Sequence, residues 1–112
     1  PADDVEASAA VRAAAAYQGP VYLRFGRMAV PVFNDPQTYH FEMGKGITLR
    51  DGKDITIVAT GLMVAEAIEA GKMLEEKGID ARIINIHSHW TSSWSARQHR
   101  KPARSSLLRS IL

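Results

Sequence analysis

The chain has 112 residues, no cysteine and a hydrophobic fraction of 46%, as expected for one small globular domain and not for a disulfide-rich or disordered chain. No apolar run approaches the roughly 20 residues that cross a bilayer, and no basic start precedes an apolar signal core, so we expect a cytoplasmic protein without a membrane partner. The net charge of +2 combines an acidic body, with nine Lys/Arg and twelve Asp/Glu in residues 1–87, and a basic tail, with five Lys/Arg and no acid in residues 88–112.

The first predicted elements are a helix from Val5 to Tyr17 and a strand from Val21 to Phe25. Asp3 or Asp4 can cap the start of the helix, and Pro20 prevents its continuation. The small residues on one helical face would let the helix lie close to a sheet; that face holds Val5, Ala9, Ala13, Ala16 and Tyr17. A helix followed so soon by a strand is the second half of a βαβ unit.

A segment rich in proline, glycine and asparagine then leads to a second group of elements. The turn sequence Asp51-Gly-Lys-Asp54 predicts a hairpin between strands at 47–50 and 55–60. A helix is predicted from about Met63 to Lys77, with a buried stripe formed by Val64, Ala67, Ile68, Gly71 and Leu74. A strand at 81–86 would complete a βαβ unit. Neither group has enough strands for a complete sheet, so we expect a fragment of a longer α/β protein.

Few residues have the spacing of a known chemical motif. The single Gly61 between strand and helix lacks the further glycines of a dinucleotide-binding turn, and His87-Ser-His89 has no nearby carboxylate to complete a metal site. Arg24 and Arg27 lie at or beyond the carboxyl end of a predicted strand, where open α/β sheets bind their ligands. Either arginine can bind a phosphate, because the guanidinium is a planar, permanently charged donor; the alternative is a surface salt bridge.

Residues 1–87 resemble the transketolase family, most closely the carboxyl-terminal subunit of split transketolases. The similarity is carried by Pro1-Ala-Asp3 with Glu6, by Gly19-Pro-Val-Tyr-Leu-Arg-Phe-Gly-Arg27 with Pro31, by Gly44-Lys-Gly46, by Asp51-Gly-Lys-Asp-Ile-Thr-Ile-Val-Ala-Thr-Gly61, and by Gly78-Ile-Asp-Ala-Arg-Ile-Ile-Asn-Ile-His87. Phe25-Gly26-Arg27 favours transketolase over deoxyxylulose-phosphate synthases and pyruvate dehydrogenase β-subunits, which share this layout.

The resemblance implies that residues 1–30 end the pyrimidine-binding domain of a thiamine diphosphate fold, that 31–46 form a linker, and that 47–87 start the carboxyl-terminal domain. Such enzymes of carbohydrate metabolism, including the pentose phosphate pathway, move a two-carbon ketol unit between sugar phosphates. They use thiamine diphosphate and Mg²⁺, and their active sites form between the subunits of a dimer. The resemblance assigns Arg27 to the terminal phosphate of the substrate.

The resemblance places every catalytic, cofactor-binding and metal-binding residue outside this chain, either upstream of Pro1 or on a separate amino-terminal subunit. We therefore expect neither thiamine diphosphate nor Mg²⁺ to bind the chain alone. The partners implied are an amino-terminal transketolase section, a homologous subunit and a sugar phosphate. The alternatives are another thiamine diphosphate enzyme such as deoxyxylulose-phosphate synthase, a non-catalytic dimerisation fragment, and a nucleic-acid binder acting through the tail.

Residues 88–112 do not follow the family pattern. Trp90, Trp94 and the five cations could form a nucleic-acid patch, but the apolar residues have neither helical nor strand spacing, so a disordered tail without a nucleic-acid partner is expected. Codons for Ser88–Leu112 can be chosen so that reading from the third base gives ALDVELVGEAAPQTGKIVTVEEHS, a family-like continuation. The sequence therefore predicts a shift of reading frame near His87–Ser88.

Overall fold

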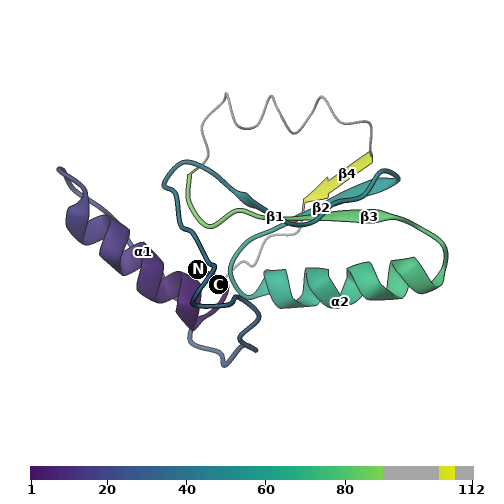
Figure 1. Ribbon diagram of the computed structural model, residues 1–112, viewed down its shortest axis with the longest axis horizontal. Coiled ribbons are helices and arrows are strands. Elements are labelled where there is room, and N and C mark those ends of the chain that lie inside the picture. Colours follow the sequence, from purple (N-terminus) through teal and green to yellow (C-terminus); the bar gives the residue numbers. More distant parts are fainter. Residues whose placement is uncertain (90–103, 108–112) are drawn as a thin grey trace.

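The computed structural model describes residues 1–89 and 104–107, which form a mixed four-stranded sheet with one helix on its face and a second helix set apart (Figure 1). In chain order the elements are α1 (Asp4–Ala16), β1 (Ile47–Arg50), β2 (Ile55–Ala59), α2 (Met63–Glu76), β3 (Ala81–Asn85) and β4 (Arg104–Leu107). The strand order is β1-β3-β2-β4. None of the helices in the described residues is both long and apolar enough to span a membrane.

The centre of the fold is the βαβ unit β2-α2-β3, and the predictions of its elements are confirmed. β2 and β3 are parallel, in a register that runs from Ile55 opposite Ala81 to Ala59 opposite Asn85. The predicted helical stripe faces the sheet: Val64, Ala67 and Gly71 are buried, while Ile68 and Leu74 pack against the same core. Gly71 brings α2 close to β3, since a Cβ at Gly71 would lie 2.5 Å from Ile83 Cδ1.

The predicted hairpin between β1 and β2 is wrong, although both strands exist. β1 pairs antiparallel with β3, which lies between β1 and β2. The turn between β1 and β2 instead passes the start of β3 so closely that a Cβ at Gly52 would lie 2.4 Å from Arg82 N. β2 carries apolar residues on both faces and is most stable inside the sheet, parallel to β3. An Asp-Gly turn makes a hairpin only where the two strands can lie side by side.

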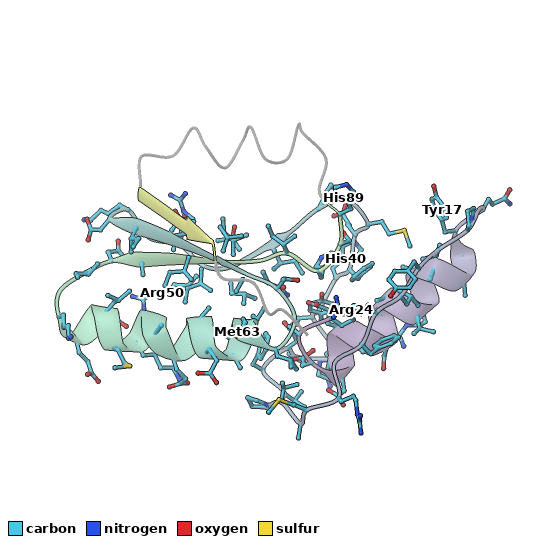
Figure 2. The ribbon with its side chains drawn as sticks, turned by 180° about the vertical axis from the view of Figure 1, so that it is seen from behind. Tyr17, Arg24, His40, Arg50, Met63 and His89 are labelled. Atoms are coloured by element: carbon cyan, nitrogen blue, oxygen red, sulfur yellow. The ribbon has the colours of Figure 1, made fainter. Side chains whose placement is uncertain are left out.

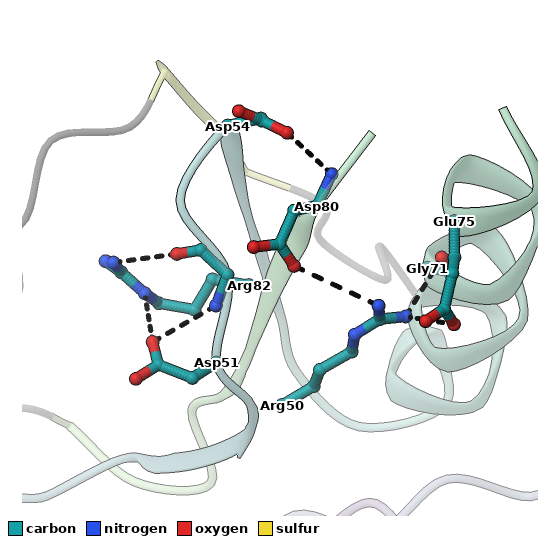
Figure 3. Close-up of polar contacts among 8 residues, drawn as sticks. Arg50, Asp51, Asp54, Gly71, Glu75, Asp80 and Arg82 are labelled. Carbon is teal, nitrogen blue, oxygen red and sulfur yellow. Dashed lines mark hydrogen bonds and ion pairs between the residues drawn. The ribbon is translucent and has the colours of Figure 1, made fainter. Parts of the chain in front are cut away.

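A polar network joins this turn to the start of β3, and Arg50 joins β1 to α2 (Figure 3). The buried Arg82 donates from Nε to Asp51 Oδ1 at 3.1 Å and from Nη2 to the Gly52 carbonyl at 3.0 Å. Asp51 Oδ1 also accepts from the Gly52 backbone N–H at 3.1 Å, and Asp54 Oδ2 accepts from the Asp80 backbone N–H at 2.7 Å. Arg50 bridges β1 to α2 through the Gly71 carbonyl and Glu75.

The predicted strand at 21–25 is not formed, and residues 17–46 contain neither helix nor strand. Tyr22 is 87% exposed and Phe25 is 50% exposed. A strand needs a neighbour to accept and donate its backbone hydrogen bonds, and none of the described residues supplies one. The alanine face of α1 likewise has no sheet against it: Ala16 and Tyr17 are exposed, and the buried residues of α1 are Glu6 and Ala10.

The expectation that residues 88–112 are disordered is wrong for Arg104–Leu107, which form β4; residues 90–103 and 108–112, including Trp90 and Trp94, lie outside the described part. β4 pairs in parallel with β2, from Arg104 opposite Ile55 to Leu107 opposite Val58. Without β4, β2 would be an edge strand with unpaired backbone groups. Backbone pairing makes few demands on side chains, which explains why a polar segment can occupy this edge.

Candidate functional site at the carboxyl edge of the sheet

A wide depression of about 1240 Å³ opens at the carboxyl ends of β2 and β3. Its floor is formed by Thr60-Gly-Leu62 after β2 and by Ile86-His-Ser-His89 after β3. Residues 21–28 also line the depression, so the two predicted fragments meet here. This is the edge at which open α/β sheets bind their ligands.

Arg24 and Arg27 both line the depression, although the predicted strand whose carboxyl end suggested them is not formed. Both residues are exposed, and among the described residues neither side chain makes a hydrogen bond or an ion pair. In the view of Figure 2, Arg24 lies near the N-terminal ends of both helices. The alternative of a surface salt bridge is therefore not formed in the described part of the chain. Two unpaired guanidinium groups in one depression suit an anionic ligand.

The wall carrying Arg27 is in tight contact with the start of α2. A Cβ placed on Gly26 would lie 2.9 Å from Leu62 Cδ2 and 3.2 Å from Leu62 Cγ, so glycine permits this approach without a shift of the Leu62 side chain or of the chain. Leu62 is the N-cap of α2 and follows Gly61, whose φ of +58° favours glycine. The contact joins an irregular segment to a regular helix.

His87 lies on the floor of the depression against Phe41, with the two ring centroids 4.3 Å apart. Both ring nitrogens are buried and have no hydrogen-bond partner among the described residues, and burial lowers the pKa of His87 to about 4. Next to it, Ser88 Oγ accepts a hydrogen bond from the Gly44 backbone N–H at 2.9 Å. Within the described residues no group of three or more His, Cys, Asp or Glu side chains could hold a metal ion, so His87 and His89 form no metal site there.

The buried, neutral His87 makes stability depend on pH. Its pKa in the folded chain, about 4, lies below the ordinary value of 6.5, so the unfolded chain binds more protons between these limits. We expect stability to be fully present above pH 6.5 and to fall as the pH drops toward 4. Urea unfolding across this pH range should show the loss of stability, and His87→Phe should abolish most of this pH dependence. His40→Gln, at an exposed histidine, is the control. If the free energy of unfolding changes equally with pH in both variants, His87 is not the cause of the pH dependence.

A buried polar cluster formed by Asp3, Glu6, Tyr39 and Asn85 was not predicted from the sequence. Glu6 is fully buried, although a glutamate in the first turn of a helix was expected only to complement the helix dipole. Its Oε1 accepts from the Ala2 backbone N–H at 2.9 Å, and its Oε2 accepts from Tyr39 Oη at 2.8 Å and Asn85 Nδ2 at 2.5 Å. Burial and the Glu6 carboxylate raise the pKa of Tyr39, so its hydroxyl stays a donor.

Asp3 extends this cluster from the helix cap to the linker. Its Oδ1 accepts from the Glu6 N–H at 2.9 Å, while its Oδ2 accepts from the backbone N–H groups of Phe33 and Asn34. The cluster therefore joins the start of α1, the segment between the predicted domains and the end of β3. Asp-x-x-Glu at a helix start is a capping-box pattern, so the sequence could have indicated the contact between Asp3 and Glu6. No sequence pattern indicates the contacts with Tyr39 and Asn85, because these residues are far from Glu6 along the chain.

Comparisons with known proteins agree with this architecture. The family model described as "Transketolase, C-terminal domain" matches residues 44–101. One subunit of the apulose-4-phosphate transketolase of Phocaeicola vulgatus is 49% identical over 72 residues, covering 64% of this chain and 23% of the relative. The 1-deoxy-D-xylulose-5-phosphate synthase of Heliobacterium modesticaldum is 41% identical over 86 residues, covering 76% of this chain and 13% of the relative.

A solved structure, "Split gene transketolase, inactive beta4 tetramer", superposes with a TM-score of 0.84 and 39% identity. The match covers 100% of this chain and 38% of that chain. The curated transketolase relatives are much longer than this chain, which spans about a quarter of their length.

Proposed function

Because the chain belongs to the transketolase family, we propose that it forms part of an enzyme that transfers a two-carbon ketol unit between sugar phosphates with thiamine diphosphate. The observation that carries this proposal is the pair of arginines that line the depression at the carboxyl edge without a partner among the described residues. In this proposal Arg27 donates two parallel hydrogen bonds to the terminal phosphate of the sugar. The enzyme would act in the cytoplasm, in pentose phosphate metabolism.

The described residues do not fit the cofactor itself. A metal-bound diphosphate needs oxygen ligands for Mg²⁺, and no cluster of carboxylates or histidines in residues 1–89 could hold a metal. The contribution of this chain is therefore to bind and orient the substrate phosphate. We propose that an amino-terminal section and a second, homologous subunit supply the remaining groups. In support, one relative is named as a single subunit of a transketolase, and the similar solved structure is a split-gene transketolase.

The experiment is a pair of chimeras in which residues 1–87 replace the matching segment of a relative. One host is the matched transketolase subunit of Phocaeicola vulgatus together with its companion subunit, and the other is the Heliobacterium modesticaldum deoxyxylulose-phosphate synthase. We expect ketol transfer in the first host and loss of synthesis in the second. The unaltered 112-residue chain should show no heat of thiamine diphosphate and Mg²⁺ binding in calorimetry.

The second candidate is a deoxyxylulose-phosphate synthase, which the relative from Heliobacterium modesticaldum favours. Activity in the synthase chimera alone would establish it. A non-catalytic dimerisation fragment is the third candidate. In that case both chimeras would assemble without activity, and the 112-residue chain would lower the activity of the intact relative by replacing one of its subunits.

A further inference from the structure

We infer that Leu62, at the start of α2, is a positioning residue for Arg27. Its side chain packs on Gly26 and fixes the backbone from which the Arg27 side chain extends into the depression. The inference rests on the proposed role of Arg27 in phosphate binding. It gives the carboxyl-terminal domain, which supplies no group to the reaction in our proposal, a defined part in substrate recognition.

The first observation is the closeness of the contact. The space above Gly26 is filled by three atoms of one side chain, since a Cβ there would meet Leu62 Cδ2, Cγ and Cδ1 at 2.9, 3.2 and 3.5 Å. The backbone of Gly26 is not left-handed, so a side chain at this position is opposed by the space that Leu62 fills and not by conformation. Leu62 is therefore the surface on which the turn before Arg27 rests.

The second observation is the difference in rigidity between the two partners. Leu62 immediately precedes α2, which is anchored in the core by the completely buried Val64 and Ala67. Residues 21–28 have no helix, no strand and no backbone ladder, so their position depends on side-chain contacts. In such a pair the anchored residue determines where the irregular segment lies.

The physical consequence concerns the geometry of phosphate binding. A paired hydrogen bond from a guanidinium to a phosphate requires both donors at the correct place, and a displacement of about 1 Å can cost up to a hundredfold in rate. A methyl group on Gly26 would lie too close to Leu62, so either the chain at Gly26 or the end of the Leu62 side chain must shift. Arg27 is the next residue and moves with Gly26 to the extent that the chain shifts.

The test uses the active transketolase chimera carrying residues 1–87. Gly26→Ala should raise KM for the phosphorylated sugar about tenfold, and leave KM for an unphosphorylated analogue within about twofold, as expected for misplacement of one phosphate ligand. Gly26→Ala combined with Leu62→Ala should recover most of the loss, because the smaller side chain leaves room for the new methyl group. Contacting residues are expected to show such non-additivity.

Gly71→Ala is the matched control. It introduces the same methyl group against another side chain, 2.5 Å from Ile83 Cδ1, but Gly71 does not line the depression. It should lower the thermal midpoint and leave both KM values unchanged. If Gly26→Ala changes stability but not the ratio of the two KM values, Leu62 is only a packing residue and the inference is wrong, while the proposed function stands. If the parent chimera lacks ketol transfer altogether, the proposed function fails and the inference fails with it.

Discussion

Replacing Arg27 by alanine in the active chimera should reduce kcat/KM for phosphorylated sugars by about ten- to a hundredfold, mainly through KM. A hydrogen bond to a charged group contributes roughly 1.5–3 kcal/mol, and each 1.4 kcal/mol corresponds to about a factor of ten. Arg27 is exposed, lines the depression and has no partner among the described residues, so its loss disrupts no visible contact. The effect should therefore appear in substrate binding and not in stability.

Two controls separate phosphate binding from other roles of Arg27. Arg12→Ala removes an equally exposed arginine from α1, away from the depression, and should leave both kinetic constants unchanged. An unphosphorylated analogue should be used equally well by the parent chimera and by Arg27→Ala. A loss of the same size with that analogue would show that Arg27 is structural, and the phosphate assignment would be wrong.

The elements with long, regular periodicity were the ones that the sequence predicted correctly. α2 has a 3.6-residue apolar stripe that ends at Gly78, and its bounds, buried face and neighbouring parallel strands all agree with prediction. The neighbours of each strand were harder to predict than the strands themselves. The residues of β1 and β2 fit strands, but no local pattern indicated that β3 would lie between them. Local sequence specifies a strand, whereas its neighbour is chosen by burial of the whole sheet.

In the candidate site, too, features that depend on local sequence could be predicted and contacts between distant segments could not. Arg24 and Arg27 were selected because ligands bind at carboxyl strand ends, but the strand at 21–25 is not formed, so their role in ligand binding stays a prediction. The fully buried Glu6 could not be interpreted, because Tyr39 and Asn85, which satisfy its carboxylate, are 33 and 79 residues away along the chain. The contact between Gly26 and Leu62 was also invisible, since it depends on how the two segments fold together.

Strand β4 bears on the predicted shift of reading frame. In the alternative frame the residues KIVTV are encoded across the codons for residues 103–108, and the structure places β4 at Arg104–Leu107 in the same stretch. The edge of β2 thus receives a strand at the place where the alternative frame encodes a far more strand-like sequence. This coincidence supports the hypothesis that residues 88–112 derive from a displaced frame.

Restoring that frame should stabilise the fold strongly. We expect a chain with residues 1–87 followed by ALDVELVGEAAPQTGKIVTVEEHS to be more stable than the 112-residue chain by roughly 3–6 kcal/mol, the contribution of burying two of the three aliphatic side chains of KIVTV. Urea unfolding of both chains would measure the difference. The control is a restored chain in which the three aliphatic residues of KIVTV are changed to serine, which should lose most of the gain. Equal stability of the original and restored chains would contradict the hypothesis, as would gene nucleotides that do not encode this peptide in the alternative frame.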